Sequence, residues 1–89
     1  MPFVLICRDK PGHLETRKAT RTDHLAYVET TAVVAQAGPI VVDDQMAGSI
    51  LILNVDTRAE AEAWAADDPY ARAGLFDSVE ILHWNRVIG

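Results

Sequence analysis

A histidine and an aspartate that lie far apart in the chain are the residues best suited to moving a proton. His24 lies three positions after Arg21, and Asp68 comes directly before Pro69. Histidine changes charge near neutral pH and therefore suits general acid or base catalysis. A carboxylate bonded to the imidazole would fix its tautomer and stabilise the imidazolium. We therefore expect His24 and Asp68 to meet in a cleft and to act as a His-Asp dyad.

Each of these residues also has a purely structural interpretation. An isolated histidine usually packs in a core or lies on the surface without any chemical role. An aspartate before Pro69 is a good N-cap for a short helical turn, because the residue before proline leaves the α region. A carboxylate has several acceptor sites, so Asp68 can cap the turn and orient His24 at the same time.

Three further side chains are candidates for binding a substrate beside His24. Arg21 can pair with an anionic group, because its guanidinium matches a carboxylate in geometry. Tyr70 can donate its hydroxyl, and Ser49, between Gly48 and an apolar strand, can place a hydroxyl at the end of a sheet. The alternatives are a solvated arginine, a tyrosine packed on a helix and a serine in a turn.

The other reactive side chains are assigned no chemistry. Arg8 and Arg17 are interpreted as solvated, although either guanidinium could contribute to binding an anion. Cys7 lies in an apolar run and is assigned to the core. His13 and His83 have no partners at metal-ligand spacing, so no metal site is predicted. Without a glycine-rich phosphate loop or a dinucleotide fingerprint, catalysis is expected to need no cofactor.

Hydrophobic periodicity, capping residues and turn residues predict the elements that would position these side chains. The order strand, helix, strand, strand, helix, strand is the ferredoxin-like βαββαβ pattern, an α+β fold with an antiparallel four-stranded sheet and helices on one face. The main elements are a strand at 3–7, a helix from Thr20 or Thr22 to about Gln36, strands at 40–42 and 49–55, a helix at 59–67 and a strand at 79–88.

Local signals set the expected helix ends. Thr20 and Asp23 resemble a capping pair, and Gly38 is interpreted as the stop of the first helix. The polar segment 14–19 is expected to form only a short helical turn. Thr57 and Glu60 form a capping box at the start of the second helix.

The central strands are apolar on both faces. Leu5 and Cys7 point to one side of the first strand, whereas Val4 and Ile6 point to the other. Helices cover only one face, and a large exposed apolar face is unusual in a monomer. We therefore expect a homodimer in which a second copy covers the open face.

Composition limits the class of protein further. The chain has 89 residues, which is the size of a single domain spanning 1–89. The formal net charge of -5 argues against broad binding to nucleic acid or anionic membranes. The apolar run at the N-terminus is too short to cross a membrane. A single cysteine suits a cytoplasmic location, because no internal disulfide can form.

Short motifs along the chain suggest a family. Their order and spacing together resemble the YciI-like (YCII-related) family over nearly the whole length. The motifs are Asp9-Lys10, Leu14-Glu15-x-Arg17, Arg21-x-x-His24-Leu25, Ala37-Gly38-Pro39, Gly48-Ser49, Ala63-Trp64-Ala65, Asp68-Pro69-Tyr70 and Ala73-Gly74.

The resemblance implies a dimeric α-β barrel built from two ferredoxin-like units. It also implies an active site in which the histidine matches His24, the aspartate matches Asp68 and the serine matches Ser49. One relative acts as a dehydrochlorinase in chloroaromatic breakdown, and the same barrel hosts muconolactone isomerases. The chain departs from the family at 22–23, where a proline-containing pair is more usual, and in the hairpin at 43–47, which is short.

Two functions are expected from these observations. The first is a cofactor-independent lyase, isomerase or dehydrochlorinase-like enzyme acting on a small organic molecule, with His24 as acid and base. The second is a non-catalytic dimeric module that binds a small ligand or has a structural role, with Asp68 as a cap. A monooxygenase of the same barrel class is a third, weaker alternative.

Overall fold

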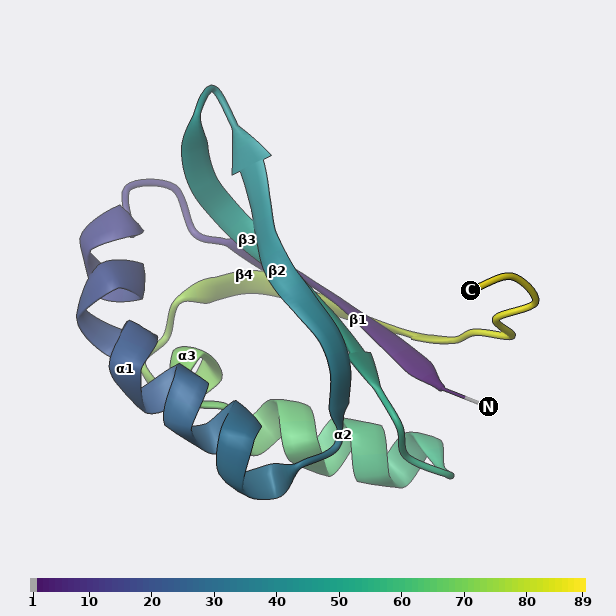
Figure 1. Cartoon of the computed structure of the whole chain (residues 1–89). Coiled ribbons are helices and arrows are strands. Elements are labelled where there is room, and N and C mark those ends of the chain that lie inside the picture. Colours follow the sequence, from purple (N-terminus) through teal and green to yellow (C-terminus); the bar gives the residue numbers. More distant parts are fainter. Residues whose placement is uncertain (1) are drawn as a thin grey trace.

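The structure, a computed structural model, describes residues 2–89 and contains four strands and three helices in that range (Figure 1). The strands form one antiparallel sheet in the order β2-β3-β1-β4. This arrangement confirms the predicted ferredoxin-like fold. In chain order, the elements are β1 (Phe3–Asp9), α1 (Leu14–Thr31), β2 (Val34–Val42), β3 (Gln45–Leu53), α2 (Arg58–Asp67), α3 (Pro69–Arg72) and β4 (Phe76–His83).

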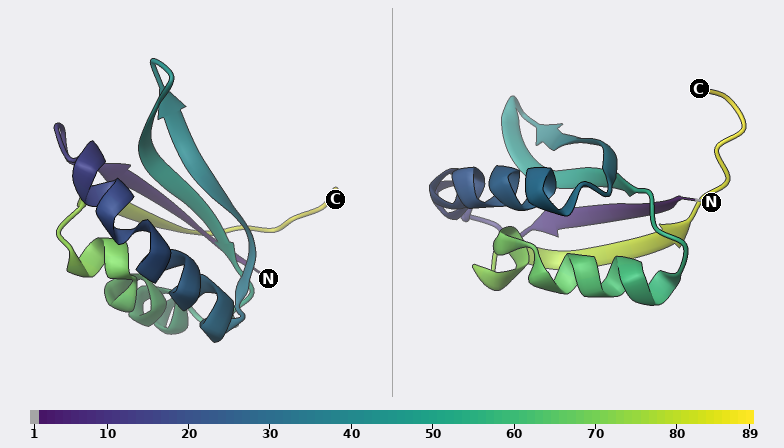
Figure 2. Two further views of the ribbon diagram at one scale, coloured as in Figure 1. Left: turned by 60° about the vertical axis from the view of Figure 1, so that its left-hand side comes forward. Right: turned by 60° about the horizontal axis from the view of Figure 1, so that its bottom comes forward.

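The core lies between the sheet and the helices, which cover one face only (Figure 2). Leu5 of β1 pairs with Leu51 of β3, and Phe3 pairs with Leu53. All four are buried, and Trp64 of α2 belongs to the same cluster. Burying one such side chain contributes about 1.5–3 kcal/mol. A one-residue slip would turn these side chains to the opposite face, so the core fixes the register of β1 against β3.

Helix α1 begins earlier and ends earlier than the sequence predicted. It starts at Leu14 and includes the segment that was expected to form only a short turn. Thr20, predicted to cap the helix, lies inside it and donates its hydroxyl to the Thr16 carbonyl oxygen at 2.8 Å. The helix ends where Ala32 takes a left-handed conformation with φ of 56°. The predicted extension to Gln36 is therefore wrong.

Strand β2 occupies the segment that was predicted to finish the first helix. Gly38 and Pro39, interpreted as the helix stop, instead pair with Ile50 and Ser49 of β3. Because β2 is an edge strand, it accommodates a proline that cannot donate a ladder hydrogen bond. Pairing along β3 therefore outweighs the helix propensity of the alanines in this segment, which is the highest of any residue but is readily overridden by tertiary contacts.

The last strand is also shorter at its C-terminal end than predicted. Strand β4 ends at His83, which pairs with Phe3 at the start of β1. The Trp84 amide still donates to the Pro2 carbonyl oxygen at 3.0 Å, and after this bond the chain leaves the sheet and extends away from the body of the molecule (Figure 1).

Helix α2 begins as predicted and is joined to α1. The Thr57 hydroxyl accepts a hydrogen bond from the Glu60 amide at 3.2 Å and donates to the Glu60 carboxylate at 3.0 Å. At the other end, the Trp64 indole donates to the Thr31 hydroxyl at 2.9 Å, and the Tyr27 hydroxyl donates to the Trp64 carbonyl oxygen at 2.8 Å. These contacts hold α1 in a fixed position over the sheet.

The face of the sheet away from the helices has an apolar centre. Ile50 and Leu82 are 44% and 42% exposed on this face. Val4 pairs with Ile52 and with Leu82, and Ile6 pairs with Ile50, so the five side chains form one patch across β3, β1 and β4. We call these five residues the outer patch.

Within residues 2–89, no helix has both the length and the hydropathy needed to cross a lipid bilayer.

Candidate active site

His24 and Asp68 meet in the structure, as the sequence predicted. The Nδ1 atom of His24 lies 2.8 Å from Oδ1 of Asp68, and both residues are buried. His24 is on the inner face of α1, in the middle of the helix and not in its first turn as expected. Asp68 is the residue at which α2 ends and α3 begins. Segments 44 residues apart in the sequence thus converge on one hydrogen bond.

Asp68 combines both of the roles considered for it. Its extended backbone, with φ of -58° and ψ of 126°, breaks the helix before Pro69. The same Oδ1 atom that contacts His24 accepts a hydrogen bond from the Tyr70 amide at 3.0 Å, so Asp68 also caps α3. A carboxylate accepts hydrogen bonds, so the neutral His24 ring carries its hydrogen on Nδ1. The lone pair on Nε2 is then available to another molecule.

The Tyr70 ring supports the histidine from one side. It stacks on the His24 ring with centroids 4.0 Å apart and planes 16° apart. Phe76 meets the edge of the Tyr70 ring, with centroids 6.0 Å apart. Burial raises the pKa of the Tyr70 hydroxyl, and this effect outweighs the lowering by the positive charges of Arg17 and Arg21. Tyr70 is therefore a neutral hydrogen-bond donor at neutral pH.

Arg17 is the site residue that the sequence did not single out. It is 3% exposed, although it was interpreted as solvated. Its Nε and Nη2 atoms donate to the two Asp9 carboxylate oxygens at 2.7 and 2.9 Å, and Nη2 also donates to the Ser49 hydroxyl at 2.8 Å. Burial disfavours the charged form, but the hydrogen bond and charge of Asp9 prevail, and the pKa of Arg17 is raised.

A signal for Arg17 was present in the sequence. Arg17, Arg21 and His24 are spaced by four and three positions, which places them on one face of a helix. That spacing becomes visible only if the helix begins before Arg17. Because the helix was expected to start at Thr20 or later, the shared face was missed.

Ser49 lies at the base of the site, on the inner face of β3. It pairs with Cys7 of β1, and its side chain is buried against Arg17. The preceding Gly48 is needed for this close approach, because a Cβ atom at that position would collide with the Cys7 carbonyl oxygen.

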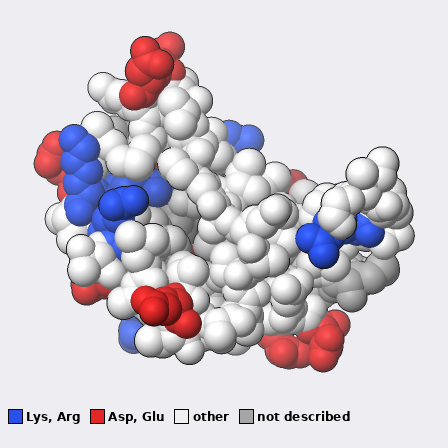
Figure 3. Space-filling model, in the orientation of Figure 1, with Lys and Arg blue, Asp and Glu red and all other residues white. Residues whose placement is uncertain are grey.

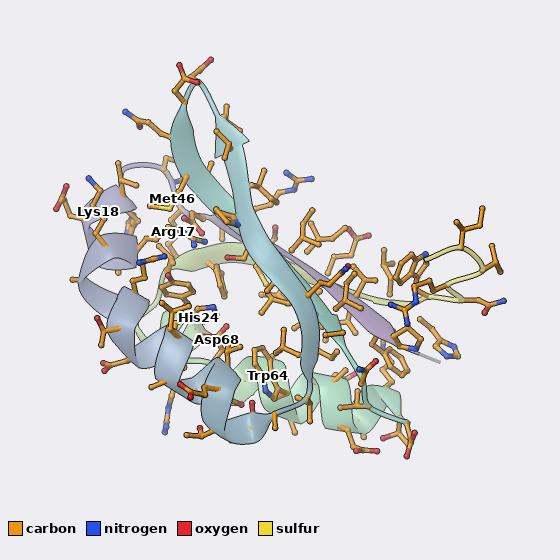
Figure 4. All side chains as sticks on the ribbon, in the orientation of Figure 1. Arg17, Lys18, His24, Met46, Trp64 and Asp68 are labelled. Carbon is orange, nitrogen blue, oxygen red and sulfur yellow. The ribbon has the colours of Figure 1, made fainter. Side chains whose placement is uncertain are left out.

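A pocket of about 190 Å³ opens between α1 and the β2–β3 hairpin. Figure 4 shows Arg17 and His24 pointing from α1 toward the strands, with Met46 approaching from β3. In Figure 3, basic side chains gather over α1 beside a hollow in the surface. Four of the predicted site residues line the pocket, namely Arg21, His24, Ser49 and Tyr70, and Arg17, which was not predicted, lines it too.

Asp68 is the one predicted site residue that does not line the pocket, and the rest of the pocket wall is mostly apolar. Asp68 is buried and is not among the pocket-lining residues, so it contacts the site through His24. The other walls include the apolar side chains of Leu25, Pro39, Met46 and Leu51. The pocket therefore combines one free imidazole nitrogen with hydroxyl and guanidinium donors on a largely apolar background. Such a set can bind a small molecule and move one of its protons.

Comparison with known proteins gives relatives over nearly the full length. The chain is 30% identical to the protein YciI of Escherichia coli, covering 98% of this chain and 99% of the relative. The chain is 33% identical to 5-chloro-2-hydroxyhydroquinone dehydrochlorinase (TftG) from Burkholderia phenoliruptrix AC1100, whose structure is solved in complex with 2,5-dihydroxybenzoquinone. It has a TM-score of 0.85 and covers 96% of this chain and 94% of that one.

A more distant structural neighbour shares the fold of this chain, but its sequence is too different to carry over its activity. An antibiotic biosynthesis monooxygenase superposes with a TM-score of 0.61 at 10% identity, covering 98% of each chain. At that identity the likeness shows a shared fold alone, which is the ferredoxin-like arrangement of strands and helices expected from the sequence. The sequence model of the YCII-related domain family matches residues 1–85 of the chain. The chain therefore belongs to the YCII-related domain family.

Proposed function

We propose that this protein is a cofactor-independent enzyme of the lyase or isomerase type, similar to a dehydrochlorinase, with His24 as its acid and base. The observation that carries the proposal is the buried hydrogen bond of 2.8 Å between His24 and Asp68 at the wall of a pocket. This contact leaves Nε2 as a base and places a negative charge where it stabilises the imidazolium formed after proton transfer.

The proposed reaction begins with a proton on a substrate hydroxyl or activated carbon. Nε2 of His24 accepts this proton, and the electron pair that held it forms a new π bond in the substrate. In an elimination, the bond to the leaving group breaks with its electron pair on that group, which departs as an anion, and His24 then releases its proton to water. In an isomerisation, the pair moves within the substrate, and His24 returns the proton to a different atom. Asp68 keeps its proton-free form throughout.

The substrate class follows from pocket size and from the dehydrochlorinase relative. An apolar cavity of about 150 Å³ takes up benzene, so a pocket of about 190 Å³ suits one substituted six-membered ring. The relative acts on a chlorinated, hydroxylated ring and binds a dihydroxybenzoquinone. We therefore assign a small hydroxylated or quinonoid ring to this pocket, with Arg21, Ser49 and Tyr70 as its binding residues.

The proposed enzyme is a homodimer. The outer patch exposes a contiguous apolar area on the face of the sheet that the helices leave open. A second copy, packed sheet to sheet, would remove this area from water and stabilise a chain of only 89 residues.

The experiment compares chloride release from 5-chloro-2-hydroxyhydroquinone by the wild type and by His24→Ala, using a chloride electrode. The variant is expected to lose activity by roughly 10²–10⁴-fold, because a positioned acid or base typically supplies that factor. His83→Ala, which changes an exposed histidine outside the pocket, is the control and should retain activity. Full activity in His24→Ala would show that the assignment is wrong.

The non-catalytic alternative also has support in the structure. The bond from the Tyr70 amide to Asp68 is that of an ordinary N-cap. If the pocket only bound its ligand, the wild type would bind ring compounds such as 2,5-dihydroxybenzoquinone without converting any of them. Turnover that depends on His24 would exclude this alternative.

A further inference from the structure

The ion pair between Arg17 and Asp9 is not needed to explain proton transfer by His24. Their side chains are 3% and 6% exposed, and two hydrogen bonds join them. Taking two charges out of water costs several kcal/mol per ion, and such pairs often add little to stability. A buried pair beside a pocket therefore calls for an explanation other than stability.

The pair is oriented with its positive end toward the pocket. Arg17 is among the pocket-lining residues, whereas Asp9 is not. The raised pKa of Arg17 keeps the guanidinium charged throughout the working pH range. Because hydrogen bonds hold both charges in place, the positive end of the ion pair stays at the side of the pocket nearest Ser49.

Arg17 also determines the direction of the Ser49 hydroxyl. A guanidinium only donates hydrogen bonds, so the contact of 2.8 Å between Nη2 and Oγ requires the Ser49 oxygen to accept. The single hydroxyl hydrogen must then point elsewhere. Among residues 2–89 it has no protein acceptor within hydrogen-bond distance, and Ser49 lines the pocket. The hydroxyl hydrogen is thus left for a ligand.

Tyr70 is held between Arg17 and His24. The Arg17 guanidinium carbon lies 4.6 Å from the centre of the Tyr70 ring, and the His24 ring is stacked at 4.0 Å. Arg17 and His24 are seven residues apart on α1, a rise of about 10.5 Å. That spacing leaves room for one aromatic ring between them. The Tyr70 hydroxyl has no protein acceptor in the described part of the chain, so it is a second donor at the pocket.

We propose that Arg17, fixed by Asp9, is a positioning residue that makes the Ser49 and Tyr70 hydroxyls a binding site for an anionic oxygen. The ligand is a small ring bound as its phenolate or enolate, with the negative oxygen at these donors and the transferable proton toward His24. This inference rests on the proposed function for the class of ligand. The donors and the fixed charge are features of the pocket itself.

The test measures ionisation of a bound probe and needs no turnover. The probe is 4-nitrophenol, whose visible absorption appears only in the phenolate form. Bound to the wild type, it should ionise at a pH lower than that of the free probe by about one unit, the effect of roughly one charge-assisted hydrogen bond. A purely structural ion pair would leave the ionisation of the probe unchanged.

Three variants assign the effect to its source. Ser49→Ala should weaken phenolate binding about 10-fold and reduce the pH shift, whereas Ser49→Thr retains a hydroxyl and should retain both. The double variant Asp9→Asn/Arg17→Gln removes both charges together, so neither is left unpaired in the interior. It should lose the shift while circular dichroism shows an intact fold. If it does not fold, the Ser49 variants decide the question.

Several outcomes would overturn the inference. These are an unshifted probe in the wild type, a shift that persists in the double variant or in Ser49→Ala, and a shift that disappears in Arg21→Gln but not in the double variant. Failure of both 4-nitrophenol and 2,5-dihydroxybenzoquinone to bind at millimolar concentration would also overturn it. A shift without turnover would contradict only the proposed enzyme, and turnover without a shift would contradict only this inference.

Discussion

At the His24 ring, the two nitrogens have different surroundings. Nδ1 faces a buried carboxylate of Asp68, whereas the ring itself lines the pocket. The Tyr70 ring prevents the imidazole from tilting, because the two are stacked 4.0 Å apart. One oxygen of Asp68 therefore controls the tautomer of His24 while it also holds the start of α3.

Asp68→Asn separates these two tasks of the carboxylate. Asparagine caps helices as well as aspartate does, so the free energy of unfolding should fall by only about 1 kcal/mol. The negative charge that stabilises the imidazolium is lost, and kcat should fall by up to about 10⁴-fold. Urea unfolding and steady-state kinetics on the same variant give both values. A variant with unchanged kcat would assign Asp68 to capping alone.

Cys7 should make stability depend on alkaline pH. Burial, with a further contribution from the negative charge of Asp68, raises the pKa of the Cys7 thiol from 9.0 to about 12. Above pH 9 the unfolded chain loses this proton while the folded chain keeps it, so stability falls as pH rises toward 12. Between pH 8 and pH 10 the free energy of unfolding should fall by about 1.4 kcal/mol more in the wild type than in Cys7→Ala.

Guanidinium unfolding of both proteins at each pH checks this value. Other groups that titrate in this range contribute equally to the two curves, so the difference between them isolates the thiol. Parallel curves for the two proteins would mean that the thiol is not protected from ionisation by the fold.

The sequence located the site residues whose types have well-known chemical roles. Histidine, and an aspartate before proline, indicated His24 and Asp68 by type, and the structure places them 2.8 Å apart. Arg17 could not be identified in this way, because exposed arginines are common and its burial depends on Asp9 and Ser49 from two different strands. Only the assembled fold brings those three residues together.

At the level of elements, α1 carries the site and its end was the hardest to predict. A left-handed C-terminal residue is usually glycine, which is why Gly38 was taken as the stop. The chain uses Ala32 instead, with φ of 56° and its amide bonded to the Val28 carbonyl oxygen at 3.3 Å. The sequence therefore contained no distinctive stop signal. The capping box at Thr57, by contrast, was explicit and marked the start of α2 correctly.

Ala32→Gly should stabilise the protein, because alanine in the left-handed region costs about 1–2 kcal/mol and glycine does not. We expect the free energy of unfolding to rise by about 1 kcal/mol, which raises Tm by roughly 4–8 °C in a domain of this size. Ala26→Gly, at an exposed position within α1, is the matched control and should lower stability by about 1 kcal/mol. Equal effects of the two substitutions would contradict this account of the helix end.

At the level of the whole molecule, the two faces of the sheet have different tasks. The inner face carries the core and, through Ser49, the base of the pocket. The outer patch supports no helix and leaves Ile50 and Leu82 nearly half exposed. Alternation along β1 indicated this division in the sequence, because consecutive apolar residues must point to opposite sides.

Ile50→Lys should dissociate the proposed homodimer. A lysine buried between two sheets would lose hydration and face the same charge on its partner, so the dissociation constant should rise by about 100-fold or more. Sedimentation at micromolar concentration should show twice the chain mass for the wild type and a single chain mass for the variant. Ala63→Lys, on the exposed side of α2, adds the same charge elsewhere and should leave the dimer intact. A wild type that sediments as a single chain would disprove the assembly.

The hairpin formed by β2 and β3 can set the substrate specificity of the pocket independently of the catalytic residues. Pro39 and Met46 come from this hairpin, whereas the groups that handle the proton come from α1 and from the break at Asp68. Ala37, also in the pocket wall, is on an edge strand with few neighbours to disturb. A larger or smaller side chain in place of Ala37 would change the shape of the pocket entrance and leave the contact between His24 and Asp68 intact. Descendants of this chain could thus acquire new substrates by changing one rim of the molecule while inheriting its chemistry unchanged.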